Sequence, residues 1–117
     1  MKTLALIFTI IVAIEHIYFL ILEMFFWTKP RTIKSFGIKS AAFAEETKIL
    51  AANQGLYNGF IAAGIIFAIL TGNQSFVIFF LICVTIAGIY GSYSTKQIKL
   101  FYAQSIPAII ALILSLV

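Results

Sequence analysis

Charged side chains are scarce in this sequence: they make up 10% of its 117 residues, against about 25% in ordinary soluble domains. Hydrophobic residues make up 62% instead. This composition excludes a typical soluble domain and indicates a protein that folds in lipid. The net charge of +4 does not indicate nucleic acid, because the basic residues stand in short stretches beside long apolar runs. We therefore expect no nucleic-acid partner.

Cysteine is also scarce, and familiar catalytic motifs are absent. The lone Cys83 lies in an apolar run, which excludes an intramolecular disulfide, a redox pair and a thiolate metal cluster. There is no Gly-x-Ser-x-Gly, no His-Glu-x-x-His and no phosphate loop, which argues against a familiar hydrolase or nucleotide enzyme. Glu15, His16 and Glu23 are too few and wrongly spaced for a transition-metal site. We expect no metal and no cofactor.

What the sequence has is four apolar stretches, each near the ~20 residues that cross a bilayer, at about 3–27, 48–70, 76–93 and 99–117. They predict an all-α fold, an integral membrane four-helix bundle that forms a single transmembrane domain over residues 1–117. The first stretch is too long for a signal peptide and has no cleavage site of small residues. The fold is therefore expected to keep all four spans.

The connection over residues 28–47 is the only long one between these stretches. Pro30 prevents the first helix from continuing far beyond Trp27. Ser40 is a candidate N-cap, which would start the second helix before its apolar stretch begins. Glu45, Glu46 and Lys48 would then lie at the membrane surface.

The basic residues predict one orientation in the membrane. Seven of the eight lie in or beside the first and third connections: Lys29, Arg31, Lys34, Lys39, Lys48, Lys96 and Lys99. Only Lys2 falls on the other side. This bias places both termini outside and the basic loops in the cytoplasm, with Trp27 in the cytoplasmic aromatic belt. A multi-pass protein of the cell membrane is expected.

Three ionisable residues lie inside the first apolar stretch, where a charge costs about 2.5–3.5 kcal/mol on insertion scales. Glu15, Glu23 and His16 fall within about 100° of one another around a helix, so they share a face. His16 and Glu23 are about 10 Å apart along the axis, too far for a direct bond. Such residues usually face the bundle interior and mark function.

Polar residues of the other stretches lie at a similar predicted depth. Asn53, Gln54, Tyr57 and Asn58 occupy an arc of about 140° on the second helix. A separate stripe of small residues on that helix allows close packing: Ala51, Gly55, Gly59 and Ala63. Counting along the helices places several polar groups in a layer about 8 Å thick on the cytoplasmic side: Glu15, His16, Asn53, Gln54, Asn58, Tyr90 and Gln104.

Glu23 is expected nearer the surface than this layer, paired with Lys48 or with a cation of the loop. The candidate ligand-binding residues are Glu15, His16, Glu23, Asn53, Gln54, Tyr57, Asn58, Tyr90 and Gln104. Pro107 removes a hydrogen bond from the fourth helix and leaves the Ala103 carbonyl without its usual donor.

Several segments carry a resemblance to a known family: Ile14-Glu15-His16, Leu22-Glu23-Met24-Phe25, Phe43-Ala44-Glu45-Glu46-Thr47-Lys48, Ala52-Asn53-Gln54-Gly55-Leu56-Tyr57-Asn58-Gly59, Gly88-Ile89-Tyr90-Gly91 and Gln104-Ser105-Ile106-Pro107. With them the chain resembles, over nearly its whole length, the small bacterial four-span membrane proteins classified as domain of unknown function 1304. The resemblance implies the four-helix architecture and the plasma membrane. It implies no activity.

Three functions remain open. The first is binding or transport of a small lipophilic, amphipathic or cationic molecule, with Glu15 as counter-charge or proton carrier; transport by four helices would need a homodimer. The second is a membrane enzyme in which Glu15 and His16 act as acid and base on a lipophilic substrate. The third is a structural protein whose basic loop binds membrane lipids or a partner.

Overall fold

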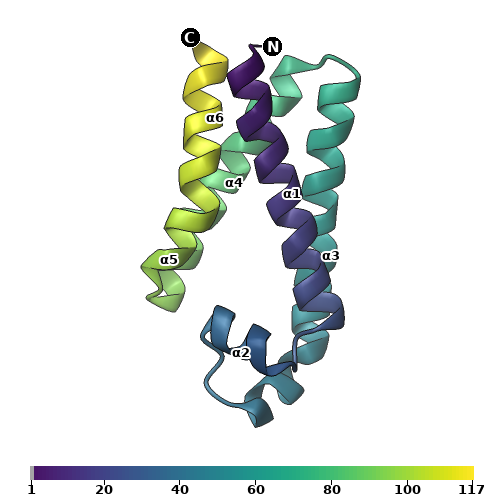
Figure 1. Ribbon diagram of the computed structural model, residues 1–117, viewed down its shortest axis with the longest axis vertical. Helices are drawn as coiled ribbons and strands as arrows, with labels where there is room; N and C mark the ends of the chain where they lie inside the picture. Colours follow the sequence, from purple (N-terminus) through teal and green to yellow (C-terminus); the bar gives the residue numbers. More distant parts are fainter. Residues whose placement is uncertain (1) are drawn as a thin grey trace. The chain divides into compact units, whose positions relative to one another are not determined.

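The computed structural model describes residues 2–117, which are helical throughout apart from short turns (Figure 1). The elements are α1 (Thr3–Phe25), α2 (Pro30–Phe36), α3 (Ala41–Leu70), α4 (Gln74–Thr95), α5 (Ile98–Leu100), the π-helical turn η1 (Phe101–Ser105) and α6 (Ile106–Leu116). Four helical stretches are long and apolar enough to cross a membrane: Thr3–Phe25, Ala41–Leu70, Gln74–Thr95 and Ile98–Leu116. The predicted all-α fold with four spans is confirmed.

Large apolar side chains cover the outside of the long helices. Ile14 is 59% exposed, Ile49 72%, Leu70 80% and Ile86 59%. Soluble monomers rarely expose apolar surface on this scale, whereas lipid tails solvate it without cost. The exposed surface therefore agrees with helices that lie in a membrane.

The helix ends follow the local signals, and the predicted Ser40 cap is confirmed, whereas helix α2 inside the connection was not predicted. Pro30 stands in the first turn of α2, and the Ser40 hydroxyl accepts a hydrogen bond from the Phe43 N–H (3.0 Å), which caps α3. The predicted connection over residues 28–47 thus contains α2 and the first turns of α3. The apolar stretch thus marks only a part of the helix, and α3 begins seven residues before it, at Ala41.

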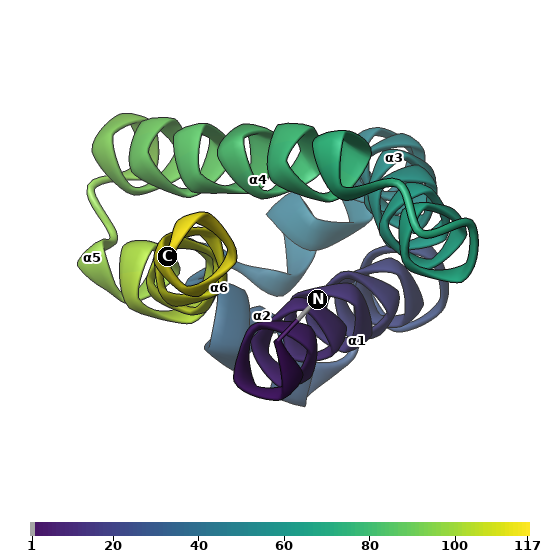
Figure 2. The ribbon, with the colours of Figure 1, turned by 90° about the horizontal axis from the view of Figure 1, so that it is seen from above.

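The chain divides into two compact units, and each is described by itself. The middle unit is His16–Ile61, and the terminal unit combines Met1–Glu15 with Ala62–Val117. In the middle unit, α1 and α3 lie side by side because α3 has glycine where they meet (Figures 1 and 2). A Cβ on Gly55 would lie 2.8 Å from the Met24 Cγ, and one on Gly59 would lie 2.5 Å from the Leu20 Cδ1. The predicted packing role of this stripe is confirmed, although Ala63 is exposed.

In the terminal unit, α4 packs against η1 and α6 (Figure 2). Pro107 lies in the first turn of α6, and the chain before it widens into the π-turn, where the Ile106 N–H donates to the Phe101 carbonyl. A π-turn is a usual response to a proline that breaks the α-helical bonding pattern. It presents Ser105 to α4, and the Ser105 hydroxyl donates to the Thr85 carbonyl at 3.0 Å.

Candidate functional site

Glu23 is the most deeply buried carboxylate of the middle unit, with 2% of its side chain exposed. Two amides of α3 bind it. Gln54 Nε2 donates to Glu23 Oε2 (2.9 Å), and Asn58 Nδ2 donates to Glu23 Oε1 (2.5 Å). Gln54 and Asn58 are four residues apart, so one face of α3 supplies both donors. Each carboxylate oxygen accepts one hydrogen bond, and both donors are neutral.

No cation of the middle unit forms an ion pair with this carboxylate. Lys48, which we expected to pair with Glu23, donates instead to Glu45 on the surface of α3. That expectation is wrong because it set residue 48 level with the end of the first span, whereas in the structure Gly55 of α3 lies against Glu23 and Met24 of α1. Counting residues along the helices placed Gln54 and Asn58 deeper in the membrane than Glu23. In the structure, both side chains donate hydrogen bonds to Glu23.

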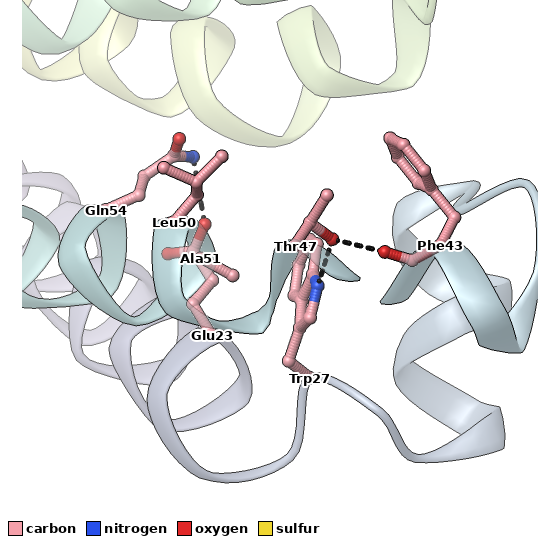
Figure 3. A pocket seen from close by; sticks show the side chains of 7 residues that line it. All are labelled: Glu23, Trp27, Phe43, Thr47, Leu50, Ala51 and Gln54. Atoms are coloured by element: carbon pink, nitrogen blue, oxygen red, sulfur yellow. Dashed lines mark hydrogen bonds between the residues drawn. The ribbon is translucent and has the colours of Figure 1, made fainter. Parts of the chain in front are cut away.

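An open pocket of about 220 Å³ lies over Glu23 within the middle unit (Figure 3). Trp27 and Phe43 supply aromatic surface to it, and Leu50 and Ala51 supply aliphatic surface. Its full lining is Glu23, Trp27, Phe43, Thr47, Leu50, Ala51 and Gln54. The pocket therefore combines one carboxylate with aromatic and aliphatic walls.

Trp27 is held in place by its neighbours. Its indole Nε1 donates to the Thr47 hydroxyl at 3.0 Å, and that hydroxyl donates to the Phe43 carbonyl at 2.7 Å (Figure 3). The Trp27 ring also meets Phe36 of α2 edge to face, with 5.2 Å between ring centroids. Aromatic pairs at this distance and angle are favourable. The indole is a fixed wall of the pocket.

A family comparison adds to this geometry. The model of the family described as "Protein of unknown function (DUF1304)" matches residues 10–116. The chain belongs to this family. It is similar to the uncharacterized protein YpaA of Lactococcus lactis subsp. lactis, with 33% identity over 118 residues that cover 98% of each chain. No solved structure matches the chain.

The other predicted site residues of this DUF1304 protein divide between the two units: His16, Asn53 and Tyr57 lie in the middle unit without contributing to the Glu23 cluster, and Glu15, Tyr90 and Gln104 belong to the terminal unit. His16 is buried and meets Phe19 edge to face at 5.5 Å. Glu15 is half-buried, and its Oε1 has no hydrogen-bond partner among residues 2–117. The remaining four are half-buried or on the outside of their helices: Gln104, Asn53, Tyr57 and Tyr90.

Phe43 and Thr47 are pocket residues that the sequence analysis did not select, and Trp27 was assigned only to the interfacial belt. The spacing of residues in the sequence does indicate Phe43 and Thr47. Positions 43, 47, 51, 54 and 58 recur at intervals of three or four, so they form one stripe on α3. With Ser40 as the N-cap, positions 43 and 47 belong to this helix. The stripe therefore continues from Gln54 and Asn58 to the first turn of the helix.

A second pocket, in the terminal unit, has about 340 Å³ but a different chemistry. Its lining contains two amides and no ionisable side chain: Leu6, Ala68, Ile69, Gly72, Asn73, Gln74 and Val77. Within the described residues, no three His, Cys, Asp or Glu side chains gather in a metal-binding group. The Glu23 pocket is therefore the candidate site, because an ionisable carboxylate lines it.

Proposed function

We propose that this protein binds a small amphipathic organic cation in the Glu23 pocket. The observation that carries the proposal is a buried carboxylate whose hydrogen bonds come only from the neutral amides of Gln54 and Asn58. A buried ionised group is costly unless an opposite charge accompanies it. A bound cation would supply that charge.

The pocket walls favour an organic cation over a metal ion. Trp27 and Phe43 offer ring surfaces, on which a cation gains about 0.5–2 kcal/mol, and Leu50 and Ala51 suit an apolar body. A metal ion would need several oxygen, nitrogen or sulfur ligands. One carboxylate, one amide and the Thr47 hydroxyl line this pocket, and that hydroxyl already bonds to Trp27 and to the Phe43 carbonyl.

Binding is the function that the pocket geometry supports, and transport of the same cation is a further step that it does not require. The positive-inside bias would place the pocket toward the cytoplasm, so we expect the cation to enter from that side. The acid–base alternative depends on Glu15 and His16, which lie outside this pocket.

The test uses two ligands of the same shape, benzyltrimethylammonium and its uncharged carbon analogue neopentylbenzene. Both are added to the purified protein in neutral detergent. Binding is followed by the melting temperature and by the fluorescence of Trp27, the only tryptophan of the chain. We expect the cation to bind at least about tenfold more tightly, because close charge pairs contribute about 1.5 kcal/mol or more.

Glu23→Gln tests the charge, and Glu46→Gln is its matched control, because Glu46 is an exposed carboxylate of the same unit. We expect Glu23→Gln to abolish the preference for the cation and Glu46→Gln to retain it. Equal binding of both ligands to the wild-type protein would refute the proposal. If no ligand binds and Glu23→Gln only lowers the melting temperature, the cluster serves the fold alone.

A further inference from the structure

Helix α2 is fixed to the end of α1 by its apolar side. Phe36 meets Trp27 edge to face at 5.2 Å and Phe19 at 6.5 Å, and Thr32, four residues before Phe36, is buried. The left-handed Gly37 (φ 65°) ends the helix. Since α2 follows the first span after a short turn, these contacts hold it at the membrane boundary that Trp27 marks.

The cations of this segment all lie on its outer surface. Lys29, Arg31, Lys34 and Lys39 are exposed, and Arg31 and Lys34 share a face of α2 at a spacing of three residues. Lys39 also lies over the Phe43 ring, with its Nζ 4.4 Å from the centroid. We call these four residues the basic surface of α2.

Few acidic groups compensate this charge. The stretch 29–39 contains no Asp or Glu, and the nearest carboxylates along the chain are the buried Glu23 on one side and the exposed Glu45 and Glu46 on the other. Glu45 accepts a hydrogen bond from Lys48 and is thus already engaged. The four cations of the basic surface are therefore largely uncompensated. Among the described residues, Glu46 is the one exposed carboxylate near them in the chain that forms no ion pair.

We propose that the basic surface of α2 is a binding site for the phosphate headgroups of anionic phospholipids. The charge is complementary, and basic residues at a membrane surface are attracted by about 1 kcal/mol each. Because Phe36 and Thr32 hold α2 with its cations outward, the cations meet the headgroup layer without a cost for ordering the helix. This site is separate from the Glu23 pocket and does not depend on the function proposed for it.

The experiment uses Trp27 as a reporter, because it contacts Phe36 of α2. The purified protein is placed in neutral detergent micelles with brominated phosphatidylglycerol or brominated phosphatidylcholine, and quenching of Trp27 is measured. We expect stronger quenching by the phosphatidylglycerol, with the difference lost at high salt. Arg31→Gln and Lys34→Gln should each reduce the preference by up to about fivefold, and the double variant more.

The control variant, Lys96→Gln with Lys99→Gln, removes two cations outside the middle unit. It should retain the preference for phosphatidylglycerol, which separates a local site from an effect of net charge. Single substitutions leave three cations in the segment, so insertion in the membrane should persist. Equal quenching by the two lipids in the wild-type protein would overturn the proposal. So would an equal loss of preference in the control, or a preference unchanged in the double variant.

Discussion

The middle and terminal units place polar groups between apolar helices, and they satisfy them differently. In the terminal unit, the Ser105 hydroxyl is neutral, and the Thr85 carbonyl accepts its one hydrogen bond. In the middle unit, Glu23 receives two hydrogen bonds from amides, yet any charge it carries has no partner of opposite charge within that unit. The hydrogen bond between Ser105 and Thr85 needs no further partner, as expected of a group that joins helices. The Glu23 carboxylate, when it is ionised, needs an opposite charge, which a ligand can supply.

In both units glycine lies where helices meet, but the two positions should tolerate an added Cβ to different degrees. A Cβ on Gly88 would lie 2.0 Å from the Ser105 Oγ and 3.0 Å from the Ser105 backbone nitrogen. On Gly55 the nearest atom is Cγ of Met24, at 2.8 Å, in a flexible side chain, and the Glu23 Cβ and the Leu20 carbonyl oxygen follow at 3.0 and 3.2 Å. The approach at Gly88 is thus the closer one, and at Gly55 the closest contact is with a side chain that is able to move.

The largest effect is expected for Gly88→Ala. Overpacking of this kind costs about 1–3 kcal/mol, and here a backbone atom must shift as well. Unfolding of the purified protein, titrated with SDS in mixed micelles, measures the change. Gly91→Ala is the control on the same helix, since a Cβ there meets nothing within 4 Å. Equal stability of the two variants would show that α4 and η1 do not approach as closely as described.

Gly55→Ala is expected to cost about 1 kcal/mol, at the low end of the same range, because Met24 can change rotamer. The Leu20 carbonyl oxygen, 3.2 Å from the added Cβ, prevents the cost from vanishing. The same SDS titration compares it with Gly88→Ala. A larger loss for Gly55→Ala than for Gly88→Ala would reverse the comparison and make the middle unit the more tightly packed one.

The sequence predicts the helices better than it predicts the site, for a physical reason. Apolar length and proline position determine spans, so the four helices and the end of α1 follow from local signals. The partners of Glu23 depend on the axial offset between α1 and α3. A shift of one turn, 5.4 Å, changes which side chains meet. The structure sets this offset through the close approach of Gly55 to Met24 and of Gly59 to Leu20, which the Ser40 cap does not specify.

A smaller effect is expected for Ser105→Ala, which removes the hydrogen bond to the Thr85 carbonyl. Hydrogen bonds between membrane helices average about 0.6 kcal/mol, and we expect a loss of that size. Ser92→Ala is the control, because the Ser92 hydroxyl bonds only within its own helix, to the Ile89 carbonyl at 2.9 Å. A stability change no greater than that of the control would mean that Gly88 packing alone joins α4 to η1.

The smallest change in stability, and a distinct optical one, is expected for Thr47→Val. Valine keeps the shape of threonine but offers no acceptor to the Trp27 indole, which donates to Thr47 at 3.0 Å. The loss should not exceed about 0.6 kcal/mol. Loss of this polar contact should shift Trp27 emission to shorter wavelength, whereas Thr47→Ser, which retains the hydroxyl, should leave it unchanged. Unaltered emission in Thr47→Val would mean that packing against Phe36 alone holds the indole. Contacts with α2 would then position the Trp27 ring that lines the Glu23 pocket. In that case Phe36→Leu would weaken ligand binding in the pocket more than any change at Thr47.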